Sequence, residues 1–308
     1  MQTSRSPRFL RRFAVRGVFW REYLDFALRH VPFYLQPILI WVWTAFFFFF
    51  AAPARRAIVE NLAVVLPGSS RIANHFRAFR TLLNFAWTIT ESAHYKLHRE
   101  DFAYEIVGSE FLDQLAAANG AIVLTAHMGS YDLGAALFAQ KFSREIRMVR
   151  APEPDRQSDQ HFRESVQQSG EGAIKIDYNT EGALLSFDLL NAVRRGEIVS
   201  IQGDRVIPGV AQATAKLFGH EAILPTGPFT LALVAKVPIF PLFIARSGYR
   251  RYRIIVGAPI TAARTTRTRD EDIADAIGAW CRILEQTIAA HWDQWFAFAP
   301  IFVAHART

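Results

Sequence analysis

Short apolar runs alternate with helix-like stretches from residue 55 onward, and this alternation limits the fold more than any other feature of the chain. The runs predict strands at 103–107, 121–126, 145–150, 173–176, 197–203, 238–245 and 252–256. The stretches between them predict helices at 109–118, 130–141, 155–168, 181–195, 227–236 and 270–290, after one or two amphipathic helices within 70–98. Such alternation is typical of a mostly parallel sheet with helices on both faces. The sequence therefore predicts one α/β domain over residues 54–308, with no repeat or linker that divides it.

Residues 1–53 differ in composition and predict a membrane anchor. Seven arginines and two acidic residues lie within residues 1–30, a pattern typical of segments that rest on an anionic membrane surface. No Lys, Arg, Asp or Glu occurs between Arg29 and Arg55, and the apolar stretch 35–52 is about long enough to cross a bilayer core. This stretch either spans the membrane or lies in its interface. The alternative is a buried core helix, because Pro32 and Pro37 interrupt its first part.

The overall composition restricts the chemistry. Cys281 is the single cysteine, so a disulfide framework and a multi-cysteine metal site are excluded, and a reducing compartment fits. Its helical, apolar setting predicts a buried packing thiol. The net charge of +7, mostly from arginine, favours anionic partners such as phosphate groups, acidic lipids or acidic proteins.

His127 follows the strand expected at 121–126, at the edge of the sheet where ligands gather. The next helix is expected to begin near Gly129 or Ser130, so that its backbone N–H groups face an anion or a developing negative charge. Asp132 falls in the first helical turn, where its carboxylate is expected to orient the imidazole. The H-x-x-x-x-D spacing thus predicts a general base with its acid partner. The alternative is a structural histidine in a turn, with Asp132 as a helix N-terminal acid.

Two further candidates in the sequence are weaker. Ser130 lacks the G-x-S-x-G spacing of a nucleophile elbow and is expected to cap the helix. His94 and His98 stand at helical spacing one turn after Glu91, which is a possible metal pattern, but no third ligand follows from the sequence. A solvated helix face is the simpler interpretation, and no metal site is predicted.

Polar residues also follow the strand expected at 197–203. Asp204 and Arg205 come directly after Gly203, so the guanidinium of Arg205 is expected to bind a phosphate or carboxylate at the same edge of the sheet. A loop that begins at Phe218 is expected to close on Thr226 and Gly227, and a helix is expected to start at Pro228. This start offers a second helix N-terminus to an anion.

Taken in order, these motifs resemble one known superfamily. Strand-end H-x-x-x-x-D, Gly-Asp-Arg after a strand, Leu-Pro-Thr-Gly-Pro before a helix and the later Val-Pro-Ile-Phe-Pro-Leu-Phe resemble the lysophospholipid acyltransferases. The chain is more similar to their lipid A biosynthesis (late) acyltransferase branch. Ala54-Arg-Arg-Ala-Ile-Val-Glu-Asn-Leu and the closing Asp293-Gln-Trp-Phe also match that branch, so the resemblance covers nearly the whole chain.

The resemblance implies a glycerolipid acyltransferase-like fold and an enzyme that moves a fatty acyl group from an acyl carrier protein or coenzyme A thioester to a lipid hydroxyl. It implies His127 as base with Asp132, and a bacterial inner membrane location with the catalytic domain on the cytoplasmic side. No cofactor and no nucleic-acid partner are implied. The candidate substrate-binding residues are Arg150, Arg163, Asp204, Arg205, Thr226 and Gly227.

Several alternatives stay open. Lipid A enzymes commonly carry Glu where this chain has Asp132, so the acceptor is either lipid A-like or another lipid, such as a phosphoglycolipid, an ornithine lipid or an aryl polyene lipid. The same His–Asp pair would also serve a membrane-bound esterase or thioesterase, and a non-catalytic lipid-binding protein is a third possibility. The closing aromatics either rest at the membrane interface or form a buried cluster: Trp292, Trp295, Phe296 and Phe298.

Overall fold

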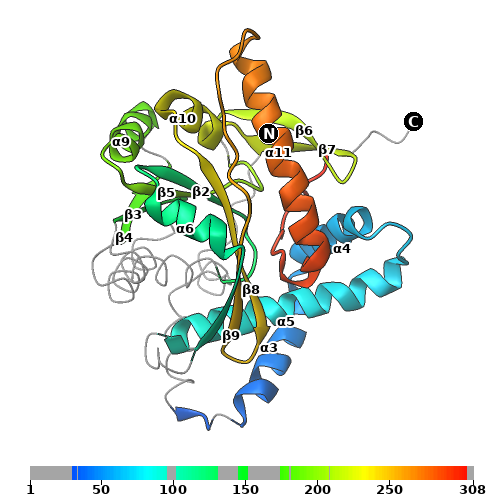
Figure 1. The fold of residues 1–308 in the computed structure, drawn as a ribbon. Coiled ribbons are helices and arrows are strands. Elements are labelled where there is room, and N and C mark those ends of the chain that lie inside the picture. Colours follow the sequence, from blue (N-terminus) through cyan, green and yellow to red (C-terminus); the bar gives the residue numbers. More distant parts are fainter. Residues whose placement is uncertain are drawn as a thin grey trace, which may run out of the picture.

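The fold is known from a computed structural model, which describes residues 30–32, 34–95, 102–130, 145–151, 174–179, 182–207 and 209–303. The basic segment 1–29 and the helices expected at 130–141 and 155–168 lie largely or wholly outside these residues. Within them, a central sheet is flanked by helices, and α3 (Gln36–Phe50) projects from one end of the molecule (Figure 1).

The central sheet has seven strands in the order β1-β9-β8-β2-β5-β3-β4. All pairings are parallel except that of β8 with β9, so the predicted mostly parallel α/β sheet is confirmed. Every expected strand is present, and the largest difference is at β8, which continues to Gly248. The bounds are β1 Ala103–Val107, β2 Ala121–Thr125, β3 Ile146–Arg150, β4 Ile174–Tyr178, β5 Ile198–Gln202, β8 Ile239–Gly248 and β9 Arg251–Val256.

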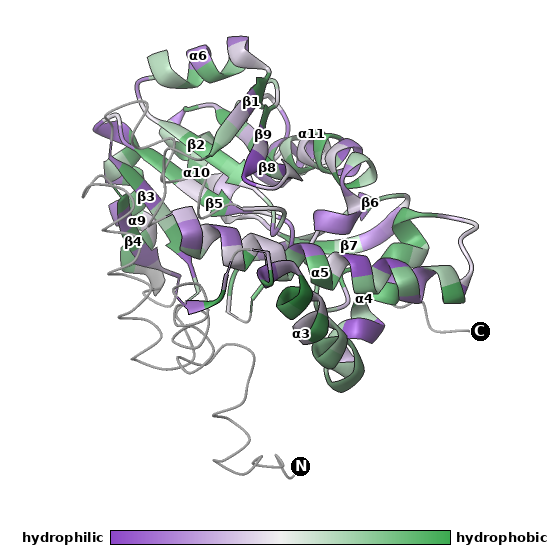
Figure 2. Ribbon diagram, turned by 90° about the horizontal axis from the view of Figure 1, so that it is seen from below, coloured by the Kyte–Doolittle hydropathy of each residue, from purple (hydrophilic) through white to green (hydrophobic). Residues whose placement is uncertain are grey.

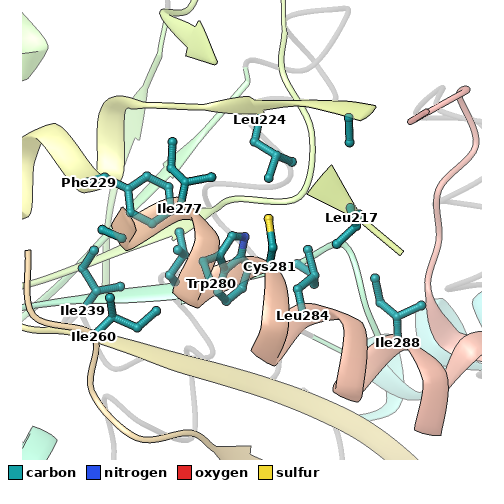
Figure 3. Close-up of a cluster of buried hydrophobic side chains, with 14 of the residues drawn as sticks. Leu217, Leu224, Phe229, Ile239, Ile260, Ile277, Trp280, Cys281, Leu284 and Ile288 are labelled. Atoms are coloured by element: carbon teal, nitrogen blue, oxygen red, sulfur yellow. The ribbon is translucent and has the colours of Figure 1, made fainter. Parts of the chain in front are cut away.

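Helices cover both faces of this sheet, as the apolar runs predicted. Along β2, Ile122 and Leu124 belong to the apolar cluster that includes α10 and α11, whereas Ala121 and Val123 belong to the cluster that includes α6. Successive side chains of a strand point to opposite faces, so both faces of β2 are buried. Figure 3 shows the first cluster, in which Trp280 of α11 lies among leucine and isoleucine side chains. The helix bounds are α6 Ser109–Ala117, α9 Gly182–Arg194, α10 Gly227–Ala235 and α11 Arg269–Ala290.

One element was missed. The sequence predicted a loop from Phe218 to Thr226, but β6 (Gln212–Leu217) and β7 (His220–Pro225) form an antiparallel hairpin there. The two residues of its turn, Phe218 and Gly219, have φ of 51° and 75°. Positive φ at both positions is typical of a tight hairpin turn, which usually carries Asn or Gly at the first position. Because Phe218 occupies the first position, the sequence does not show the usual hairpin-turn residues.

The N-terminal part of the described chain consists of three helices: α3, α4 (Ala52–Val65) and α5 (Arg71–Tyr95). Pro53 lies in the first turn of α4, and the axes of α3 and α4 differ by 90°. Among the described residues, no single helix has both the length and the apolar character to cross a membrane, although the bent pair α3 and α4 together has both. The predicted anchor stays a prediction, and its expected boundary after residue 53 falls inside the first turn of α4.

Helix α5 is tied to its surroundings by buried polar residues. Glu91 is completely buried and accepts hydrogen bonds from Arg246 Nε at 3.0 Å and from the hydroxyl of Tyr252. His94 is also buried, and its Nε2 lies 3.1 Å from Oε1 of Gln36 on α3. The expected solvated face at Glu91 and His94 is therefore wrong, because these side chains join α5 to β8, β9 and α3. His98 lies outside the described residues.

Candidate active site

The end of β2 brings His127 next to two residues that follow β5. The strands are parallel neighbours, with Thr125 paired to Gln202, so both chains leave the sheet at the same edge. His127 Nδ1 lies 2.7 Å from Oδ1 of Asp204, and Arg205 Nε lies 3.1 Å from His127 Nε2. Both ring nitrogens of His127 thus have side-chain partners.

Asp204 is completely buried at the centre of this arrangement. Its other oxygen, Oδ2, accepts a hydrogen bond from the indole Nε1 of Trp295 at 3.1 Å. Burial by itself raises the pKa of Asp204, but His127, Arg205 and the Trp295 N–H together lower it more, so the pKa lies well below its usual range. Asp204 is therefore an ionised carboxylate at neutral pH.

These partners fix the tautomer of His127. A carboxylate only accepts hydrogen bonds, so the ring donates its proton from Nδ1 to Asp204. A guanidinium only donates, so Nε2 carries a lone pair that faces Arg205. A neutral imidazole with the proton on Nδ1 is the form that a general base needs, because Nε2 is then the basic atom.

Two glycines let the backbone approach closely enough to build the site. Gly129 has φ of 53°, and a Cβ there would lie 1.7 Å from the carbonyl oxygen of Ile244. A Cβ at Gly203 would lie 2.7 Å from Cδ1 of Leu124, and the Gly203 carbonyl accepts a hydrogen bond from Trp280 Nε1 at 3.0 Å. The chain just after each of the two strands is thus held in position by packing.

The expected anion site at the start of the next helix is wrong for its first two residues. The N–H of Gly129 donates to the carbonyl of Gln294 and that of Ser130 donates to the carbonyl of Ile244, both at 3.0 Å. Neither group is available to an anion. The Ser130 hydroxyl is buried 3.0 Å from the hydroxyl of Ser92, and the helix that it was expected to cap lies outside the described residues.

The C-terminal segment completes the site, a role that the sequence did not predict. The N–H of Phe296 donates to the His127 carbonyl at 2.8 Å, and the side chain of Gln294 bonds both the N–H and the carbonyl of Arg246. Trp295 and Phe296 are buried, so the buried cluster is the correct alternative for them and the membrane interface is wrong. Only the Asp293-Gln-Trp-Phe motif signalled that this segment mattered.

The other predicted site residues are distributed as follows. Arg150 ends β3, which pairs with β5 on the side away from β2, so it lies at the same edge as His127 but two strands away. Thr226 and Gly227 begin α10 with Pro228 in its first turn, as predicted, and the Thr226 N–H donates to the Ala211 carbonyl. Asp132 and Arg163 lie outside the described residues.

Cys281 has no part in this site. It is buried, as predicted, and burial raises the pKa of its thiol to about 12, so it is a poor nucleophile at neutral pH. It borders a cavity of about 310 Å³ between β6 and α11, whose lining includes none of His127, Asp204 and Arg205. In the part of the chain that the structure describes, no three His, Cys, Asp or Glu residues come together as a metal site.

Comparison with known proteins gives the family. A search of curated proteins found no match. Residues 16–303, nearly the whole chain, match the model of the protein family described as bacterial lipid A biosynthesis acyltransferase. This match covers the segment predicted as an anchor from Arg16 onward, the α/β domain and the closing Asp293-Gln-Trp-Phe motif, and it identifies the chain as an acyltransferase that acts on lipid. The chain belongs to the bacterial lipid A biosynthesis acyltransferase family.

Proposed function

We propose that this lipid acyltransferase transfers a fatty acyl group from an acyl carrier protein or coenzyme A thioester to a hydroxyl of a lipid A-type glycolipid, with His127 as the general base. The observation that carries the proposal is the bond from His127 Nδ1 to the buried Asp204, which leaves Nε2 as the basic atom. An alcohol is a weak nucleophile at neutral pH and needs such a base as it attacks a thioester.

A single atom, Nε2 of His127, accepts the hydroxyl proton and later releases it. Nε2 of His127 takes the proton of the acceptor hydroxyl while the hydroxyl oxygen bonds to the thioester carbonyl carbon. The resulting tetrahedral intermediate collapses, the C–S bond breaks, and the imidazolium returns the proton to the leaving thiolate. The ester and the free thiol are the products. Asp204 stabilises the imidazolium between these steps, because its carboxylate stays ionised.

Asp132 remains a second proposed partner of His127, on the strength of the H-x-x-x-x-D spacing. Because Nδ1 carries a single proton, we expect Asp204 and Asp132 to differ in effect. Asp204→Asn should disturb the tautomer, because the amide has one accepting oxygen, whereas the carboxylate accepts from both His127 Nδ1 and Trp295 Nε1. Asp132→Asn, with the same assay, tests whether the second carboxylate contributes.

The proposed substrate contacts are Arg150, Arg163, Arg205, Thr226 and Gly227, with Asp204 holding the base. Arg150 and Arg205 stand at the carboxyl edge of the parallel strands, where ligands bind in α/β sheets. Guanidinium groups suit phosphate or carboxylate groups of a lipid or of the acyl donor. The net charge of +7 likewise favours an acidic carrier protein as donor.

A membrane location is proposed from the outer face of α3. On this helix the polar side chains of Gln36 and Thr44 are buried against the protein, whereas most of the large apolar side chains are exposed. Figure 2 shows α3 as mostly hydrophobic. Large apolar side chains that are exposed side by side on one helix are typical of an interaction surface. The exposed residues of α3 are Ile38, Trp41, Val42, Phe46, Phe49 and Phe50, and α5 also exposes Ile72 and Phe76.

We propose that this face lies in the bacterial inner membrane, with the α/β domain on the cytoplasmic side. Trp41 and Phe48 of α3 both pack edge-on against Phe79 of α5, so α5 holds α3 and its exposed face in position. The acceptor is then a lipid that never leaves the membrane. A phosphoglycolipid, an ornithine lipid or an aryl polyene lipid is the alternative acceptor, and a thioesterase that uses the same imidazole is the alternative reaction.

One assay separates these possibilities. Detergent-solubilised protein is incubated with acyl carrier protein thioester and a lipid A precursor, and the products are identified by mass spectrometry. Acylated lipid supports the proposal, free fatty acid as the main product supports a thioesterase, and neither product with any of the acceptors indicates a protein that only binds lipid. His127→Ala should lower transfer by at least about 10²-fold, the scale of a lost general base.

A further inference from the structure

The basic nitrogen of His127 is occupied in the structure. Arg205 Nε donates to His127 Nε2 at 3.1 Å, and Nδ1 is engaged with Asp204. An imidazole whose Nε2 lone pair accepts a bond from a guanidinium cannot take a proton from a hydroxyl or from water at the same time. In this arrangement the Nε2 lone pair is engaged by Arg205 rather than open to a hydroxyl or water.

The charge of Arg205 strengthens this effect. The guanidinium is positive at any relevant pH, and a proton on Nε2 would bring two cations into contact. Two charged groups contact the imidazole ring nitrogens: the Asp204 carboxylate and the Arg205 guanidinium. Asp204 favours protonation of His127 and Arg205 opposes it, so the position of the guanidinium decides when the base works.

The surroundings allow Arg205 to leave without disturbing Asp204. Asp204 is fully buried and held by Trp295, and the preceding Gly203 is held through its carbonyl by Trp280. Arg205 is only partly buried. Rotation of its long side chain thus moves the guanidinium while the carboxylate stays in place.

We propose that the Arg205 guanidinium guards His127, that is, it blocks Nε2 until an anionic group of the acceptor displaces it. A phosphate or carboxylate beside the acceptor hydroxyl binds the guanidinium, as such groups prefer, and draws it from Nε2. The base is then exposed only when the acceptor is bound. This inference rests on the proposed function, and it adds that the acceptor carries an anion close to the reacting hydroxyl.

The guard changes which nucleophile reaches the thioester. Without an acceptor, Nε2 accepts the Arg205 N–H and does not activate water, so the thioester survives. With the guard removed, water gives its proton to Nε2 and attacks the carbonyl carbon, the C–S bond breaks, and the thiolate leaves with that proton. Free fatty acid and thiol are then formed in place of acylated lipid.

The test compares Arg205→Met and Arg205→Lys with the unaltered protein in two assays: fatty acid release from acyl carrier protein thioester without acceptor, and acylation of a lipid A precursor. In Arg205→Met we expect release to rise and acylation to fall, so that their ratio changes by about 10- to 100-fold, the scale of one hydrogen bond to a charged group. Arg205→Lys should lie between the two. Arg195→Met is the matched control, because Arg195 is an exposed arginine that pairs with Glu197 before β5, and it should leave the ratio unchanged.

A second measurement needs no turnover. Nitrogen NMR of labelled histidine follows the His127 ring with N-acetylglucosamine 1-phosphate or with the uncharged N-acetylglucosamine. In the unaltered protein, the phosphate sugar alone should shift the titration of His127 to higher pH. In Arg205→Met, that higher titration should be present without any ligand. Two results would contradict the proposed blocking of Nε2 by Arg205. One is unchanged fatty acid release in a folded Arg205→Met protein, and the other is identical His127 titrations in the two proteins. If the unaltered protein showed the NMR shifts but formed no acylated lipid, the proposed function would be contradicted instead.

Discussion

Trp295 lies 91 positions from Asp204 in the sequence, yet its indole N–H donates to Oδ2 of Asp204 at 3.1 Å. The other oxygen of the same carboxylate faces His127. Because both oxygens are engaged, the carboxylate cannot rotate, and the imidazole that it holds cannot rotate either. The closing segment of the chain therefore sets the orientation of the candidate base.

Trp295→Phe tests how much the hydrogen bond from Trp295 to Asp204 stabilises the protein. Phenylalanine keeps most of the buried ring but has no N–H, so the free energy of unfolding should fall by about 1.5–3 kcal/mol, the range for a hydrogen bond to a charged group. Acyl transfer should fall as well. Trp292→Phe is the control, because the half-buried Trp292 ring contacts the Arg80 guanidinium rather than Asp204. Equal stabilities of the two variants in urea unfolding would contradict the expected role.

The depressed pKa of Asp204 predicts a specific dependence of stability on pH. The unfolded chain binds a proton at this group near pH 3.9, whereas the folded protein binds it only at lower pH. The stabilisation is therefore complete above that value and is lost as pH falls through it toward the folded pKa. The difference in unfolding free energy between the unaltered protein and Asp204→Asn should shrink as the pH falls below about 4.

Urea unfolding from pH 3 to pH 7 measures this difference. Asp113→Asn, on the exposed side of α6, is the control and should show no such gap at any pH. A gap for Asp204→Asn that does not change across the range would mean that the charge of Asp204 does not stabilise the fold.

Gly129→Ala should be far more harmful than an alanine at another glycine with positive φ. Gly68 has φ of 78° and open space around it, so Gly68→Ala should cost about 1–2 kcal/mol from backbone conformation alone. At Gly129, the added Cβ would also meet the Ile244 carbonyl at 1.7 Å, so the loop at His127 must shift. We expect a larger loss of stability and loss of acyl transfer, measured by thermal unfolding and by the product assay. Equal losses in the two variants would show that the close approach is unimportant.

Phe49→Asp should weaken membrane binding with little effect on folding. Phe49 is 70% exposed on α3, so a charge there meets water in the isolated protein but would enter the apolar phase of a membrane. Phe187→Asp on α9, where the phenylalanine is 65% exposed, is the matched control for charge and exposure. Cosedimentation with anionic vesicles should fall for Phe49→Asp alone. A similar fall for both variants would point away from α3 as the contact.

Much of the fold could be predicted from the sequence, because apolar period and turn residues act locally. The alternation of runs was sufficient to give every strand of the central sheet and, in the described residues, the helices between them. The β6–β7 hairpin was missed because Phe218 occupies a left-handed position without the usual Asn or Gly. The expected end of the apolar stretch at 52 lies next to the break between α3 and α4, but the 90° bend there was not predicted, since composition does not give the angle between two helices.

The site was only half predictable for a different reason. His127, Asp204 and Arg205 were expected at one sheet edge, since each follows a strand of a parallel sheet. The pairing of Nδ1 with Asp204 depends on how β2 and β5 lie side by side, which spacing along the chain does not reveal. Trp295 and Gln294 reach the site from the end of the chain, and long-range contacts of this kind leave no local pattern.

The buried Glu91 forms part of a continuous series of hydrogen bonds. Gln36 on α3 bonds His94 of α5, Glu91 one turn earlier bonds Arg246, the backbone of Arg246 bonds the Gln294 side chain, and the Gln294 carbonyl receives the N–H of Gly129, two residues after His127. The series fixes the distance between the imidazole and α3, whose exposed face we propose to meet lipid. A glycolipid resting against α3 would therefore meet the histidine at a depth that the protein, and not the bilayer, determines.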